Sequence, residues 1–273
     1  MVSTYLLSLR EGLEAALIIG IVVGALRKIQ RSDLLLSLWL GVLAAVGVSI
    51  LSAVLLTVFG LELEGQVEVI YEGVTMFLAA GILTWMIFWM SRQAGSIKGE
   101  LEDGVNKAVA GSGKSSMFWL AFVAVVREGM ELALFLTAAF FAGRNDQLGS
   151  NTIQTLAGTL LGLGTAALFG WSLLASAVRL DLRRFFQVTG FLLILFAAGL
   201  VAQGVHEFNE IGWIPFIIEH IWNVNTFIDE NSVPGQLLRT LFGYNGDPSL
   251  TEMIGYLGYL ISITFLFRRR KTL

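Results

Sequence analysis

The chain of 273 residues has no cysteine, only two histidines and few charged residues. Without cysteine it can form no disulfide, no thiolate metal site and no cysteine nucleophile, so a metal must be bound by oxygen or by histidine. The net charge of −3 offers no basic face for phosphates, which excludes nucleic-acid binding. Charged residues make up 14% of the chain, against about a quarter in soluble domains, while hydrophobic residues make up 55%. The mean hydropathy of +0.74 is that of a membrane protein.

The hydrophobic residues are concentrated in runs that can cross a bilayer, for which about 20 residues are needed. Seven such runs predict seven transmembrane helices, at residues 3–27, 34–59, 67–90, 116–142, 152–178, 184–205 and 249–267. No basic residue precedes the first run, so we expect it to remain as a helix and not to be a cleaved signal peptide. Residues 211–224 are apolar but short, which predicts an interfacial or re-entrant segment. The predicted fold is an all-α polytopic membrane protein with one domain, residues 1–273.

The basic residues are distributed unevenly among the connections between these runs. Most of the 18 follow the first, third, fifth or seventh run. Because cytoplasmic loops carry the excess of lysine and arginine, we expect the N-terminus outside and the C-terminus in the cytoplasm. Residues near Lys98 and Arg183 would then face the cytoplasm, and those near Glu62 and Asp229 the outside. The outer loops are rich in acids, so the outer face should attract cations.

The sequence contains an internal repeat. A shift of 117 residues places REGLE of residues 10–14 on REGME of residues 127–131. The repeats cover residues 3–91 and 116–208, and each holds three spans, an odd number, so the second must be inverted relative to the first. Inverted three-helix repeats are a transporter architecture, with the site near the midplane where the repeats meet. The outer loop and the last helix, 209–273, lie outside the repeat.

Both copies of the motif place ionisable residues inside an apolar span. Each charge there costs about 2.5–3.5 kcal/mol on insertion scales, and such residues are typically functional. Residues three or four apart share one helix face, and the two motifs lie at similar depth near the midplane. We therefore expect a carboxylate site between the first and fourth spans. Its residues are Arg10, Glu11 and Glu14 of the first motif and Arg127, Glu128 and Glu131 of the second.

A structural alternative is that each arginine only neutralises the glutamate four residues away and the motifs lock two helices together. This accounts for half of the charges, because one glutamate per motif and Glu72 of the third span are left over. Glu72 could instead accept a hydrogen bond from a neighbouring backbone group. A buried carboxylate is a costly way to satisfy one donor, so we expect Glu72 on the ion pathway.

Five segments carry a family resemblance: LREGLEAALI, YEG followed by LTWMIFWM, VVREGMELALFL, FAAGLVAQGVHEFNEIGW and FGYNGDPSLTEMIGYLGYL. Together the chain resembles, over nearly its whole length, the oxidase-dependent iron permeases: the fungal high-affinity iron permease and its bacterial Efe-type relatives. The resemblance implies that Glu11, Glu14, Glu128 and Glu131 bind iron during passage. It also implies the cytoplasmic (inner) membrane of a bacterium, with an extracytoplasmic iron-binding protein and an oxidase or peroxidase as partners.

Other candidate residues carry a weaker signal. His206, Glu207 and Glu210 stand at the outer end of the sixth span, where together with Glu68 they form a candidate outer access site. A solvated helix end rich in polar residues is an equally good interpretation. The second histidine, His220, has no partner that the sequence reveals. Tryptophans such as Trp85 and Trp89 of the third span are expected in the interfacial belt or the core.

We therefore expect an iron permease in the lipid bilayer, with iron as its transported substrate, no permanently bound cofactor and no enzymatic activity. Manganese, lead or zinc remain alternative cargoes, because carboxylate oxygens accept many hard or borderline ions. A membrane-embedded hydrolase is disfavoured, because five buried carboxylates against two arginines repel an anionic substrate. If Glu72 joins the two motifs, the site carries three formal negative charges, which favours ferric iron, with ferrous iron as the alternative.

Overall fold

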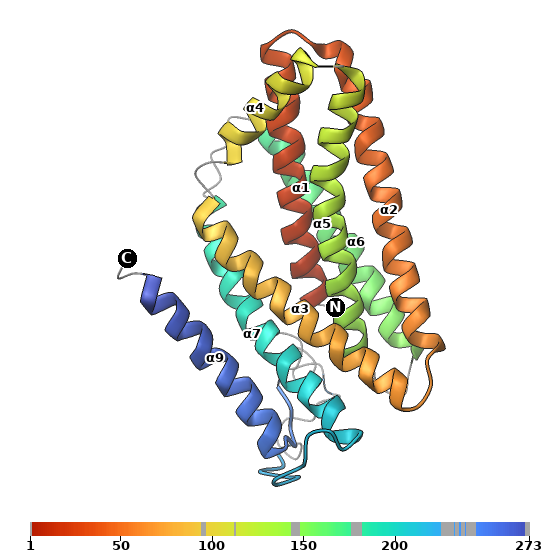
Figure 1. The fold of residues 1–273 in the computed structure, drawn as a ribbon, viewed down its shortest axis with the longest axis vertical. Helices are drawn as coiled ribbons and strands as arrows, with labels where there is room; N and C mark the ends of the chain where they lie inside the picture. The colour runs from red at the N-terminus through yellow and green to blue at the C-terminus, as the bar shows by residue number, and fades with distance from the viewer. Residues whose placement is uncertain are drawn as a thin grey trace.

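The computed structural model describes residues 2–93, 97–111, 113–142, 148–175, 182–224 and 244–270, together with 232, 235 and 238. These residues form long helices, and no strand occurs among them, which confirms the predicted all-α class (Figure 1). The elements are α1 (Val2–Lys28), η1 (Ser32–Leu34), α2 (Leu35–Glu62), α3 (Gln66–Gln93), α4 (Ile97–Ala110), α5 (Lys114–Ala142), α6 (Leu148–Ala175), α7 (Leu182–Glu210) and α9 (Leu250–Arg270). Asp229, used above to predict the orientation, lies outside the described residues, as do the side chains of Lys98 and Arg183.

Five stretches of helix are long and apolar enough to cross a membrane: residues 32–62, 66–89, 153–172, 188–210 and 250–268. Each coincides with a predicted span. The other two predicted spans also form helices, α1 with 27 residues and α5 with 29. Each of these two carries three charged motif residues inside its apolar stretch, and this charge distinguishes it from the other five. Many apolar side chains of α2 and α6 are exposed, as expected of helices that face lipid.

Helix α4 is not among the predicted spans, because only one of its faces is apolar. Leu101, Val105 and Ala108 recur at helical spacing, and the last two are buried with residues of α1 and α5. Asp103 and Lys107 on the other side are exposed. Helix α4 is therefore a short amphipathic helix that covers one end of the α1 and α5 pair.

The charged motifs lie on two neighbouring antiparallel helices. In Figure 1, α1 and α5 lie side by side and run in opposite directions, with α2 beyond α5. Val22 and Leu26 near the end of α1 belong to the same buried cluster as Met117 and Ala121 near the start of α5. The most extensive helix contacts are those of α2 with α5 and of α1 with α6, followed by α3 with α7.

Two glycines inside the motifs allow close helix approach. A methyl group on Gly12 of α1 would lie 2.7 Å from the Ala166 Cβ on α6, and one on Gly129 of α5 would lie 2.6 Å from the Ser49 Cβ on α2. Cβ atoms do not come this close, so both positions need glycine. Gly129 follows Gly12 by 117 residues, and Ala166 follows Ser49 by the same number. The two glycines are thus equivalent positions of the sequence repeats, and so are their two partners. Each glycine contacts the partner that lies in the other repeat, so the two contacts are crossed.

The segment before α9 folds back on the chain that precedes it. The backbone N–H groups of Ile221, Val224 and Leu250 donate to the carbonyls of Pro248, Gly246 and Ile218 at 3.2, 2.9 and 3.0 Å. Residues 211–224, predicted to be interfacial or re-entrant, are non-helical in the structure.

Candidate metal site

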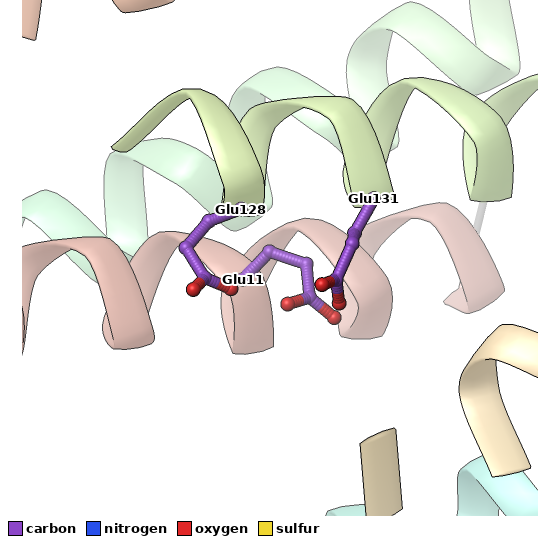
Figure 2. Close-up of side chains that lie close together, drawn as sticks. All are labelled: Glu11, Glu128 and Glu131. Atoms are coloured by element: carbon purple, nitrogen blue, oxygen red, sulfur yellow. The ribbon is translucent and has the colours of Figure 1, made fainter. Parts of the chain in front are cut away.

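The two motifs bring three carboxylates together between α1 and α5. One oxygen atom of each of Glu11, Glu128 and Glu131 lies within 4.8 Å of the other two. Figure 2 shows the three side chains reaching from the two helices toward one another. Glu11 and Glu128 are buried. Carboxylates this close repel one another away from water, so a cation between them would stabilise the site.

Arg10 pairs with both glutamates of its own motif. Its Nη1 donates to Glu11 Oε1 at 3.0 Å, and its Nη2 lies 3.2 Å from Glu14 Oε1. Nη1 also lies 3.4 Å from the Met86 sulfur on α3. The Arg10 side chain is only 2% exposed. The first motif therefore holds its guanidinium fully inside the protein.

Arg127 of the second motif is placed differently. Its Nε donates to Glu131 Oε1 at 3.2 Å but lies 4.0 Å from Glu128 Oε1. The guanidinium lies over the Trp89 ring, 4.2 Å from its centroid, and 5.9 Å from that of Trp85. The Arg127 side chain is 36% exposed. An aromatic face attracts a cation, so α3 draws Arg127 away from Glu128.

Several oxygen atoms of the motifs are available as metal ligands. Oε2 of Glu11, Glu128 and Glu131 is buried and accepts no hydrogen bond within the described part of the chain. Glu14 Oε1 is near Arg10 but outside hydrogen-bond geometry. A buried oxygen left without a donor costs about 1–3 kcal/mol. Carboxylate oxygen is a ligand that hard and borderline cations accept, so metal binding would recover this cost.

Glu72 lies elsewhere on α3. It is buried, but Met86, which contacts Arg10, follows it by fourteen residues, or about 21 Å of helix. A methyl group on the adjacent Gly73 would lie 3.4 Å from the Glu207 Cβ on α7. Glu72 therefore lies in the part of α3 that packs against α7, away from the carboxylates of the two motifs. A role for Glu72 on the ion pathway stays a prediction.

The candidate outer access residues are partly brought together. His206 Nε2 lies 3.3 Å from Glu210 Oε1, and His206 Nδ1 lies 3.1 Å from Glu252 Oε1 at the start of α9. Glu68 lies on another helix, in the first turn of α3. His220 has Asp247 as its partner, with Nδ1 at 2.9 Å from Oδ2.

The sequence did not predict the contacts that Glu252 makes with His206 or that Trp85 and Trp89 make with Arg127. The signal for Glu252 is the S-x-x-E spacing of Ser249 and Glu252, a capping box. In the structure the Ser249 backbone N–H donates to Glu252 Oε1, and the Glu252 N–H donates to Ser249 Oγ, both at 3.3 Å. For Trp85 and Trp89, the signal is their four-residue spacing, which puts both rings on one face of α3.

Comparisons with known proteins show which family the chain is similar to. The family model of the iron permease FTR1 family matches residues 1–268. The chain belongs to this family. It is 32% identical over 265 residues to the ferrous iron permease EfeU of Escherichia coli O6:K15:H31 (strain 536 / UPEC), covering 96% of this chain and 94% of the relative. The same identity holds for the ferrous iron permease EfeU of Yersinia pestis, with 96% and 92% covered. No solved structure matches the chain.

Membership of the iron permease family confirms the resemblance found in the sequence. The chain is a membrane transporter of iron and not an enzyme, so the hydrolase alternative is excluded. One 32% identical relative, from Escherichia coli strain K12, carries the name putative inactive ferrous iron permease EfeU.

Proposed function

We propose that this protein moves iron inward across the cytoplasmic membrane of a bacterium through the motif cluster, defined as Glu11, Glu14, Glu128 and Glu131. The observation that carries the proposal is the set of buried carboxylate oxygens without hydrogen-bond donors, which converge from α1 and α5. The arginine of each motif lowers the repulsion among these carboxylates and leaves oxygens free to bind the ion.

The proposed ion is ferrous iron. Without Glu72, the four glutamates and two arginines of the motifs carry two formal negative charges. A low-dielectric site is most stable when its charges balance, so the cluster matches a divalent ion better than a trivalent one. The ferric preference predicted from the sequence depended on Glu72 joining the cluster, whereas the part of α3 that carries Glu72 packs against α7. The relatives named ferrous iron permease support the same choice.

The proposed architecture is seven transmembrane helices in an inverted repeat, residues 3–91 and 116–208, followed by α9. Support comes from the crossed glycine contacts, because a two-fold relation that exchanges α1 with α5 and α2 with α6 also exchanges these contacts. The N-terminus is outside in this arrangement. An extracytoplasmic iron-binding protein and an oxidase or peroxidase are the proposed partners, on the family resemblance.

The test is uptake of radioactive ferrous iron, under reducing conditions, into liposomes that hold only this chain. Glu14→Gln and Glu131→Gln keep the side-chain shape but remove the charge, so each should abolish uptake while the protein still inserts and stays folded. Glu64→Gln, at an exposed position between α2 and α3, is the control and should transport normally. Normal uptake by the Glu131 variant would show that the second motif is structural.

A further inference from the structure

His206 in the last turn of α7 is held by a buried carboxylate. Its Nδ1 lies 3.1 Å from Glu252 Oε1, and the Glu252 side chain is 5% exposed. A carboxylate only accepts hydrogen bonds, so Nδ1 carries the proton. Glu252 in turn accepts from Ser249 Oγ at 2.8 Å and from Asn245 Nδ2 at 2.7 Å. The imidazole ring is therefore fixed in orientation, with Nε2 directed away from Glu252.

The other ring nitrogen faces a second carboxylate. Nε2 lies 3.3 Å from Glu210 Oε1, one helical turn further along α7. A nitrogen lone pair and a carboxylate oxygen are both acceptors, so a proton or a cation must lie between them. Two ligands at about 2.1 Å and at right angles around one ion are about 3.0 Å apart. The observed separation is close to this value, and both side chains are accessible to water.

We propose that His206 Nε2 and Glu210 form a capture site for a hydrated divalent cation, with Glu252 as the positioning residue. The proposal rests on the proposed function, for which it supplies the first binding step. A ligating histidine whose other nitrogen donates to a carboxylate is the usual arrangement in metal sites. One imidazole and one carboxylate suit a borderline divalent ion such as ferrous iron, whereas ferric iron prefers oxygen ligands alone.

The site is built for transient binding. It offers two protein ligands, so water fills the remaining coordination positions and the ion can leave again. Glu207 is the residue after His206, and it is buried beside Gly73, the neighbour of Glu72. Glu207 therefore lies next to the capture site, on the side of α7 that packs against α3.

The competing interpretation is a protonated His206 that ties two carboxylates together and binds no metal. Because the chain has only two histidines, nuclear magnetic resonance of the full-length protein in detergent, with ¹⁵N-labelled histidine, resolves the two cases. The paramagnetic probe is Mn²⁺. We expect the His206 ring signals to broaden at Mn²⁺ concentrations that leave His220 sharp. His220 is the matched control, since it also pairs with an acid, Asp247.

Two variants make the test specific. Glu210→Gln keeps the His206–Glu252 contact but removes a ligand charge, and should raise the Mn²⁺ concentration needed for broadening. Glu252→Gln should raise that concentration by about tenfold and shift the Nδ1 resonance, because the acceptor of its proton loses its charge. Equal broadening of both histidines, no broadening of His206, or an unchanged response in the Glu210 variant would each overturn the proposal.

Transport separates this proposal from the proposed function. Glu210→Gln should raise the ferrous iron concentration for half-maximal uptake several-fold with the maximal rate kept, whereas His220→Ala should change neither. If the motif variants kept full uptake, the proposed function would fail while selective Mn²⁺ broadening at His206 would still establish the capture site.

Discussion

Arg127 shares its positive charge between a carboxylate and an indole. The contact with Trp89 holds the guanidinium 4.0 Å from Glu128, whereas Arg10 bonds directly to Glu11, the equivalent residue of the first motif. Trp89 therefore keeps the Glu128 carboxylate available for a cation. The sequence does not reveal this role of Trp89, because both motifs have the same charged residues and differ only in how their side chains are placed.

Replacing Trp89 should weaken iron binding. Trp89→Leu removes the aromatic face and lets Arg127 approach Glu128, where its charge competes with the iron ion. A cation–π contact is worth about 1 kcal/mol, so the iron concentration for half-maximal uptake should rise roughly fivefold. Trp89→Phe keeps a ring and should lie between Leu and wild type. Trp171→Leu, at an exposed position on α6, is the control. Equal effects of Phe and Leu at position 89 would point to lost volume and not to the ring.

Ion charge can be tested at the same residues. Mn²⁺ should compete with ferrous iron uptake more strongly than Ga³⁺ at equal free concentration, because the motif cluster carries two formal negative charges. Glu72→Gln should leave this preference unchanged, since Glu72 lies apart from the cluster. Stronger competition by Ga³⁺ than by Mn²⁺ in liposome uptake would contradict the charge match.

Among the helices, the closest approaches depend on glycine. An alanine at position 129 would push α5 away from α2, and one at position 12 would push α1 away from α6. Gly129→Ala and Gly12→Ala should each lower the free energy of unfolding by about 1–3 kcal/mol, and with it the midpoint of thermal unfolding in detergent. Gly47→Ala and Gly164→Ala are matched controls, because they too are repeat equivalents and have no atom within 4 Å of an added methyl group. These controls should be as stable as wild type or more stable, since alanine favours a helix by about 1 kcal/mol.

The sequence predicts where the helices lie along the chain better than it predicts which helices pack against one another. Apolar runs locate the long helices, and the R-E-x-x-E spacing predicts the meeting of Glu11 with Glu128, because helix formation and helix faces are local properties. The separation of Glu72 from that cluster depends on how α3 crosses α1 and α5, which no local pattern contains. Helix α4 is missed for another reason: its apolar residues are spaced at helical intervals and not contiguous.

For the molecule as a whole, the orientation in the membrane can be read with single cysteines, since the native chain has none. Asp33 lies between α1 and α2, and Glu64 between α2 and α3. A cysteine at position 64 should react with an impermeant thiol reagent in intact cells, and one at position 33 only after the membrane is opened. Reaction of both from the same side would show that α2 does not cross the bilayer.

The two arginines show that equivalent halves of this molecule are in different environments. Arg10 is enclosed and Arg127 is partly open, and α3 packs on α5 more extensively than α7 packs on α1. If the repeats are related by a two-fold axis in the membrane plane, exchanging these environments produces a second conformation that opens to the opposite side. Arg127 would then be enclosed and Arg10 open. The different exposure of the two equivalent arginines is therefore what we expect of one conformation in an alternating-access transport cycle.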